Sequence, residues 1–151
     1  MKNIFSHILL ASALLTGTHY ASAKETPVNI ETTQPEPAGL QQLIDSHFAI
    51  WNDTHSAERA KKFPEVYTHD FFVADENGLN QGMAQVNAAI SKVQSLHSCF
   101  IFTPAPVQWN HGIARVSWGY GPASNPFLVR GEDIFTVTHN KLSSARVFLE
   151  K

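Results

Sequence analysis

Between residues 40 and 51, apolar residues recur regularly every three or four positions. This is the spacing of one face of a helix, and the residues are Leu40, Leu43, Ile44, Phe48 and Trp51. The spacing predicts a helix over residues 40–53. A shorter helix is expected from Ser56, a residue type that caps helices, to Phe63, just before Pro64.

After residue 66 the apolar residues gather into short runs that are typical of strands. Residues 67–74 read as a strand, "DENG" at 75–78 as a turn, and residues from Gly82 onward as a third helix. Further strands are expected at 99–102, 113–120, 127–138 and 142–149, separated by clusters of Pro, Gly and Asn. Helices followed by antiparallel strands predict an α+β domain with its helices on one face of the sheet.

The first 23 residues have the pattern of a secretory signal peptide. Lys2 precedes an apolar run, and the small residues "ASA" precede Lys24. The run is too short for a membrane span, which needs about 20 apolar residues. We therefore expect a periplasmic or secreted protein with a signal peptide at 1–23, a flexible linker at 24–38 and one domain at 39–151. The alternative is that the first residues form a helix of the domain.

The net charge and the cysteine content limit the classes of function that this chain can have. The formal net charge is -2, and removal of Lys2, the only charged residue of the predicted signal peptide, leaves -2 - 1 = -3. This balance argues against nucleic acid or an anionic membrane as a partner. The single cysteine, Cys99, excludes an intrachain disulfide and is expected to be buried beside Phe100 and Ile101. The eight histidines show no paired ligand spacing, so no metal and no cofactor are predicted.

Three polar residues occupy positions where the pattern calls for apolar ones. Asp75 ends the run "FFVA", His47 lies within the first helical stripe, and Asp133 lies on the apolar face of a strand. A buried, unpaired charge costs several kcal/mol, so Asp133 is paired, protonated or facing a wet cavity, and His47 poses the same problem on its helix. Each of the three residues also has a purely structural explanation. "DENG" is a good type I turn, and His47 and Asp133 can satisfy each other.

These segments carry a resemblance to a known family. The order of two helices, "VYTHDFFVADENG", a helix opened by Gly82, and strands ending in "GEDIFTVTHNKLSSARVF" resembles the nuclear transport factor 2-like superfamily, in its SnoaL-like and ketosteroid isomerase-like branches. The resemblance covers the chain from Leu40 onward. It implies a cone in which a curved antiparallel sheet wraps around N-terminal helices, a SnoaL-like or cystatin-like α+β barrel with an apolar pocket, and commonly a homodimer.

The resemblance also implies roles for the three polar residues. Asp75, which begins a "D-x-x-G" pattern, would be the general base. Asp133, which begins a "D-hydrophobic-hydrophobic" pattern, would be protonated and donate to the substrate oxyanion. His47 stands where that family has a tyrosine. Its neutral imidazole can still donate one hydrogen bond, but this departure weighs against steroid isomerisation itself. Glu76 replaces the usual proline after the base.

The pocket is expected to be lined by five aromatic residues, although such residues are also typical of a plain core: Trp51, Tyr67, Phe72, Trp118 and Phe135. Two function hypotheses follow. The first is a cofactor-free isomerase or cyclase in which Asp75 abstracts a proton beside a carbonyl. The second is a non-catalytic carrier of a small apolar molecule, or an interaction module. A homodimer is expected through an apolar outer sheet face at Trp109, Val116 and Trp118.

Overall fold

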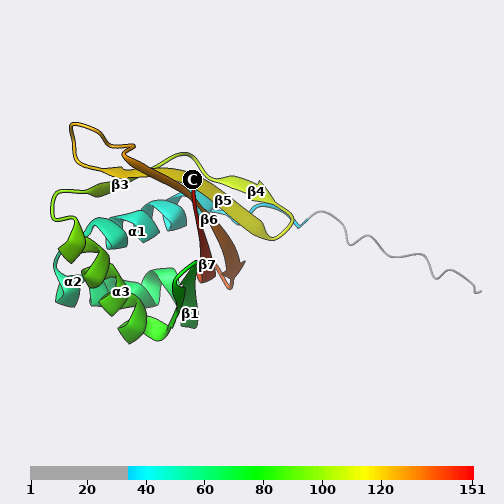
Figure 1. Ribbon diagram of the computed structural model, residues 1–151. Helices are drawn as coiled ribbons and strands as arrows, with labels where there is room; N and C mark the ends of the chain where they lie inside the picture. The colour runs from blue at the N-terminus through cyan, green and yellow to red at the C-terminus, as the bar shows by residue number, and fades with distance from the viewer. Residues whose placement is uncertain (1–33) are drawn as a thin grey trace, which may run out of the picture. The chain divides into compact units, whose positions relative to one another are not determined.

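The computed structural model describes residues 34–151 (Figure 1). The predicted signal peptide at 1–23 and most of the predicted linker at 24–38 lie outside the described residues. The last linker positions, 34–38, are described and form neither helix nor strand. Within residues 34–151 no helix combines the length and the apolar character needed to span a bilayer.

Three helices form close to where the apolar spacing places them: α1 (Leu40–Asn52), α2 (Ser56–Val66) and α3 (Gly82–Leu96). The stripe on α1 is buried at Leu40, Ile44 and Phe48. Helix α2 was expected to end before Pro64, but it continues to Val66. A proline lacks the N–H donor and its ring crowds the preceding turn, but the helix continues past Pro64, and the Tyr67 N–H bonds to the Phe63 carbonyl at the helix end.

Seven strands form one sheet with the order β2-β1-β7-β6-β5-β3, and β4 pairs with β5. All neighbouring strands are antiparallel except β1 and β7, which are parallel, so the sheet is mixed rather than antiparallel as expected. The sheet curves around α1, with α2 and α3 beside that helix (Figure 1). This α+β cone is the predicted fold class. The strands are β1 (Tyr67–Asp75), β2 (Gly78–Gln81), β3 (Ile101–Pro104), β4 (Gln108–Asn110), β5 (Ile113–Gly121), β6 (Val129–Thr138) and β7 (Lys141–Leu149).

Strand β5 shows which side of the sheet faces the helices. Val116, Trp118 and Tyr120 are buried on its inner face, whereas Arg115 and Ser117 are exposed between them. The prediction of an outer apolar patch at Val116 and Trp118 is therefore wrong, because both side chains point into the cone. At these positions the outer face instead carries an ion pair between Arg115 and Glu132, and the homodimer itself stays an untested expectation.

Cys99 is exposed, contrary to the prediction that it is a buried apolar residue. Its strand was expected to begin at residue 99, but β3 begins at Ile101. Cys99 therefore remains in the loop between α3 and β3, outside the regular alternation of the sheet.

The helices are joined by a fully buried cation, Arg59 of α2. Its guanidinium donates to the side chains of Asn87, Ser91 and Gln94 on α3 and to the Asp53 carbonyl after α1. Neutral oxygen atoms thus satisfy a charge that would otherwise be costly to bury. The contacts fix how the three helices meet beneath the sheet.

Candidate ligand-binding pocket

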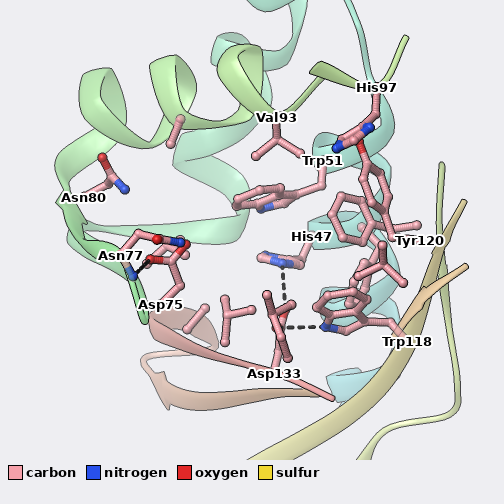
Figure 2. A pocket seen from close by; sticks show the side chains of 18 of the residues that line it. His47, Trp51, Asp75, Asn77, Asn80, Val93, His97, Trp118, Tyr120 and Asp133 are labelled. Carbon is pink, nitrogen blue, oxygen red and sulfur yellow. Dashed lines mark hydrogen bonds and ion pairs between the residues drawn. The ribbon is translucent and has the colours of Figure 1, made fainter. Parts of the chain in front are cut away.

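A pocket of about 410 Å³ lies between the inner face of the sheet and helices α1 and α3 (Figure 2). This is the size range of small-molecule sites. Its wall is mostly aromatic and aliphatic, and the apolar lining residues are Phe48, Trp51, Val73, Ala89, Val93, Leu96, Phe102, Trp118, Val129, Ala145, Val147 and Leu149.

The deepest polar groups of the pocket are His47 of α1 and Asp133 of β6, which we call the floor pair. Their side chains are only 2% and 7% exposed, and His47 Nε2 lies 3.7 Å from Asp133 Oδ2. This distance permits charge attraction but exceeds that of a hydrogen bond. Figure 2 shows the two side chains facing each other across the floor. The sequence singled out both residues, and the fold brings them together.

Each member of the floor pair is held by a second polar group. The Tyr67 hydroxyl lies 3.0 Å from His47 Nδ1, and the Trp118 Nε1–H donates to Asp133 Oδ1 over 2.9 Å. Burial raises the pKa of Tyr67 far above its ordinary value. The Tyr67 phenol therefore keeps its proton.

A glycine allows Trp118 to reach the floor pair. Gly131 of β6 is the register partner of Trp118 on β5. A Cβ atom at Gly131 would lie 2.5 Å from Trp118 Cζ2 and 2.6 Å from Cη2, closer than side chains pack. The missing side chain leaves room for the indole to lie across β6 toward Asp133, two residues further along the strand.

Asp75 lies at one side of the pocket, at the tip of the β1–β2 hairpin. Its Oδ1 accepts the backbone N–H groups of Asn77 and Gly78, which is the turn predicted from "DENG". The residue is exposed, yet it lines the pocket together with Asn77 and Asn80. The turn accounts for the hydrogen bonds of one carboxyl oxygen. Because Asp75 also lines the pocket, it is within reach of a bound molecule.

The opposite side of the pocket carries Tyr120 of β5 and His97 at the end of α3 (Figure 2). Tyr120 is 6% exposed, and its hydroxyl has no hydrogen-bond partner within the described chain. Burial raises the pKa of Tyr120. The His97 ring stands edge-on to Tyr120, with ring centroids 5.8 Å apart.

A second hollow, of about 720 Å³, lies outside the pocket between the β1–β2 hairpin and α3. It adds Gln85 and Lys92, and the residues that line both hollows are Asp75, Asn77, Asn80, Ala89, Val93 and Leu96. The outer hollow therefore lies directly beside the inner pocket, where the hairpin and α3 border both.

The five aromatic residues predicted to line the pocket take different places. Trp51 and Trp118 line it. Tyr67 and Phe135 lie behind His47, with ring centroids 5.8 and 4.9 Å from the imidazole. Phe72 is on the other face of β1, where the Arg146 guanidinium lies 5.0 Å above its ring. Phe71, its neighbour, is the one that packs inward.

Sequence reasoning missed several pocket residues. Tyr120 shares the inner face of β5 with Trp118, so strand alternation alone would have placed it beside the pocket. Asn77, Asn80 and His97 carry no such pattern, because they lie in or next to a turn, a short strand and a helix end. Among residues 34–151 no group of three or more His, Cys, Asp or Glu residues is arranged to hold a metal ion.

No protein-family model matches the sequence, and no curated protein matches it. Solved structures do match. A candidate isomerase of the SnoaL-like family from Agrobacterium tumefaciens is 15% identical, with a TM-score of 0.67 over 73% of this chain and 96% of that one. A candidate SnoaL-like polyketide cyclase from Jannaschia sp. is 16% identical, with a TM-score of 0.59 over 78% and 91% of the two chains.

A candidate ketosteroid isomerase from Kribbella flavida is 15% identical, with a TM-score of 0.56 over 74% of this chain and 77% of that one. At such identities the likeness concerns the fold, which hosts many unrelated functions. The domain described by residues 34–151 therefore has the nuclear transport factor 2-like fold, which SnoaL-like and ketosteroid isomerase-like proteins share.

Proposed function

We propose that the domain binds a small, mostly apolar molecule inside the cone and holds one of its oxygen atoms at the floor pair. The observation that carries this proposal is a buried ionisable pair, His47 and Asp133, in a pocket whose wall is otherwise mainly apolar. Such a pair is costly to bury unless its hydrogen-bonding capacity is used. A ligand oxygen between Nε2 and Oδ2 would use it.

Binding can be followed through the tryptophans. Trp51 and Trp118 line the pocket, whereas Trp109 does not, so Trp109→Phe removes the background signal. We expect 2-acetylnaphthalene to quench the fluorescence of this variant in a saturable manner. Val93→Phe, which fills the pocket, should weaken binding at least tenfold. Val107→Phe adds the same volume away from the pocket and serves as control; equal binding by both variants would overturn the proposal.

The location proposed for this activity is the periplasm or the extracellular space, on the basis of the N-terminal sequence. Native mass spectrometry of protein recovered from that fraction tests location and ligand together. We expect a chain that begins at Lys24 and carries a small molecule released on denaturation. The homodimer remains a proposal from the family resemblance, and the same spectrum reports the assembly mass.

We further propose proton transfer beside a carbonyl as the chemistry of the pocket. A carboxylate would take a proton from carbon while the His47 imidazole donates a hydrogen bond to the oxygen on which negative charge develops. We assign the first role to Asp75 in this proposal, because Asp75 lines the pocket and only its Oδ1 serves the turn. The neighbouring structures with isomerase and cyclase descriptions support this reaction class by analogy only.

One observation favours the carrier hypothesis: the hydrogen bonds of the turn already account for an aspartate at position 75 without any catalytic role.

Turnover of 3-cyclohexenone, a β,γ-unsaturated ketone, distinguishes the enzyme hypothesis from the carrier hypothesis. For an enzyme, Asp75→Asn should lower turnover by a factor of about 100 or more, with 2-acetylnaphthalene binding retained, because the amide oxygen can still accept the turn N–H groups. Glu76→Gln, outside the pocket lining, is the matched control. Binding without turnover in the wild type would support the carrier.

A further inference from the structure

His47 is enclosed by aromatic rings, and within residues 34–151 two polar side chains lie near its nitrogen atoms. The ring centroids nearest to the imidazole lie 4.9 to 6.5 Å away. The polar neighbours are the Tyr67 hydroxyl at Nδ1 and the Asp133 carboxyl near Nε2. These two groups therefore decide which nitrogen carries the proton of the neutral ring. The enclosing rings belong to Phe48, Trp51, Tyr67, Phe71 and Phe135.

Tyr67 determines the state of Nδ1. Its phenol stays protonated because burial raises its pKa, and Nδ1 is the acceptor within hydrogen-bond distance of the hydroxyl. If Nδ1 carried a hydrogen, it would have to donate to the phenol oxygen, and the phenol hydrogen would lose its partner. The favourable arrangement has Tyr67 donating to a bare Nδ1, with the ring hydrogen on Nε2.

Asp133 then faces donors on both sides. Trp118 Nε1–H donates to Oδ1, and His47 Nε2–H points toward Oδ2 across 3.7 Å. Because donors face both carboxyl oxygens, this geometry favours Asp133 as an acceptor rather than as the hydrogen-bond donor that the family resemblance implies. Because 3.7 Å is too long for a hydrogen bond, Nε2–H and Oδ2 both keep capacity for a ligand.

We infer that Tyr67 is a positioning residue that fixes His47 as an Nε2–H donor, so that the floor pair offers one donor and one acceptor side by side. The matching ligand class is a ketone that carries a hydroxyl on the adjacent carbon. Its carbonyl oxygen accepts from His47, and its hydroxyl donates to Asp133. This inference rests on the proposed binding function and specifies the ligand of the same pocket.

The tautomer can be observed without any ligand. Long-range proton–nitrogen NMR of the imidazole distinguishes the two ring nitrogens, and His47→Gln assigns the signal. We expect a protonated Nε2 and a bare, hydrogen-bonded Nδ1 in the wild type. Tyr67→Phe should shift the Nδ1 resonance toward that of a free imine nitrogen. Tyr120→Phe removes the same atom from a tyrosine without contact to His47 and should leave the spectrum unchanged. A protonated Nδ1 in the wild type would overturn the inference.

The ligand class is tested with two probes on the same ring system, 2-acetylnaphthalene and hydroxymethyl 2-naphthyl ketone. The second should bind about fivefold more tightly, as expected for one added hydrogen bond, and Asp133→Leu should bring the ratio near one. Equal binding of both probes to the wild type would overturn the ligand class. Failure of both probes to bind would instead count against the proposed binding function, while the tautomer measurement still decides the role of Tyr67.

Discussion

At the scale of single residues, Gly131 determines whether the floor pair is held in place. We predict that Gly131→Ala displaces the Trp118 indole, because the new Cβ would lie 2.5 Å from Cζ2. The hydrogen bond from Trp118 to Asp133 would then be lost. Overpacking of this kind costs about 1 to 3 kcal/mol, measurable as a lower free energy of unfolding in urea together with an altered near-ultraviolet circular dichroism spectrum.

A double-mutant cycle is the control for this steric explanation. Phenylalanine lacks the outer ring atoms that the new Cβ would meet, so Gly131→Ala should cost less in a Trp118→Phe background. Relief should be partial, since the Phe148 carbonyl oxygen also lies 2.8 Å from the added atom. An equal cost in both backgrounds would show that the indole is not the obstacle.

The candidate site could be predicted from the sequence where a polar residue breaks an apolar pattern. His47 and Asp133 were identified in this way, because helical and strand spacing places them on inner faces. The choice of Phe72 failed because either of two adjacent phenylalanines could face inward. Strand β1 also carries an irregularity in its pairing with β7 between Tyr67 and Phe72, which the sequence does not reveal.

At the scale of elements, local periodicity was sufficient to predict the three helices and the four long strands. It missed β2 and β4, which have three or four mostly polar residues and exist because a neighbouring strand pairs with them. The parallel pairing of β1 with β7 was also unpredictable, since it joins residues about 70 positions apart through contacts that leave no local pattern. Strand direction in this sheet is a property of the whole fold.

The connection between α1 and α2 shows how elements far apart in sequence depend on one loop residue. The Asp53 carbonyl accepts from Arg59 and from Gln94 of α3, while its side chain accepts from Lys62 and from the His55 backbone N–H. One residue thus joins the ends of all three helices. Because α1 also carries His47 and α3 lines the pocket, the same contacts support the geometry of the binding site.

At the scale of the whole molecule, this junction predicts how stability depends on pH. The Lys62 ammonium and the His55 backbone N–H hold the pKa of Asp53 at about 2, against 3.8 for an unperturbed carboxyl. A lowered native pKa means that the unfolded state binds more protons in acid. The stabilisation is therefore complete above pH 3.8 and is lost as the pH falls through about 2.

The solvent exposure of the Asp53–Lys62 pair determines how much stability is lost in acid. The full shift corresponds to about 2 kcal/mol, but Lys62 is 51% exposed, so solvent screening reduces the expected contribution to about 1 kcal/mol.

We predict that Asp53→Asn lowers the free energy of urea unfolding by about this amount at pH 7 and by little near pH 2. The mutant and wild-type curves should therefore converge in acid. Asp70→Asn, which removes an exposed carboxyl on β1, is the charge-matched control. Parallel acid profiles for wild type and Asp53→Asn would exclude the helix junction as a source of acid sensitivity.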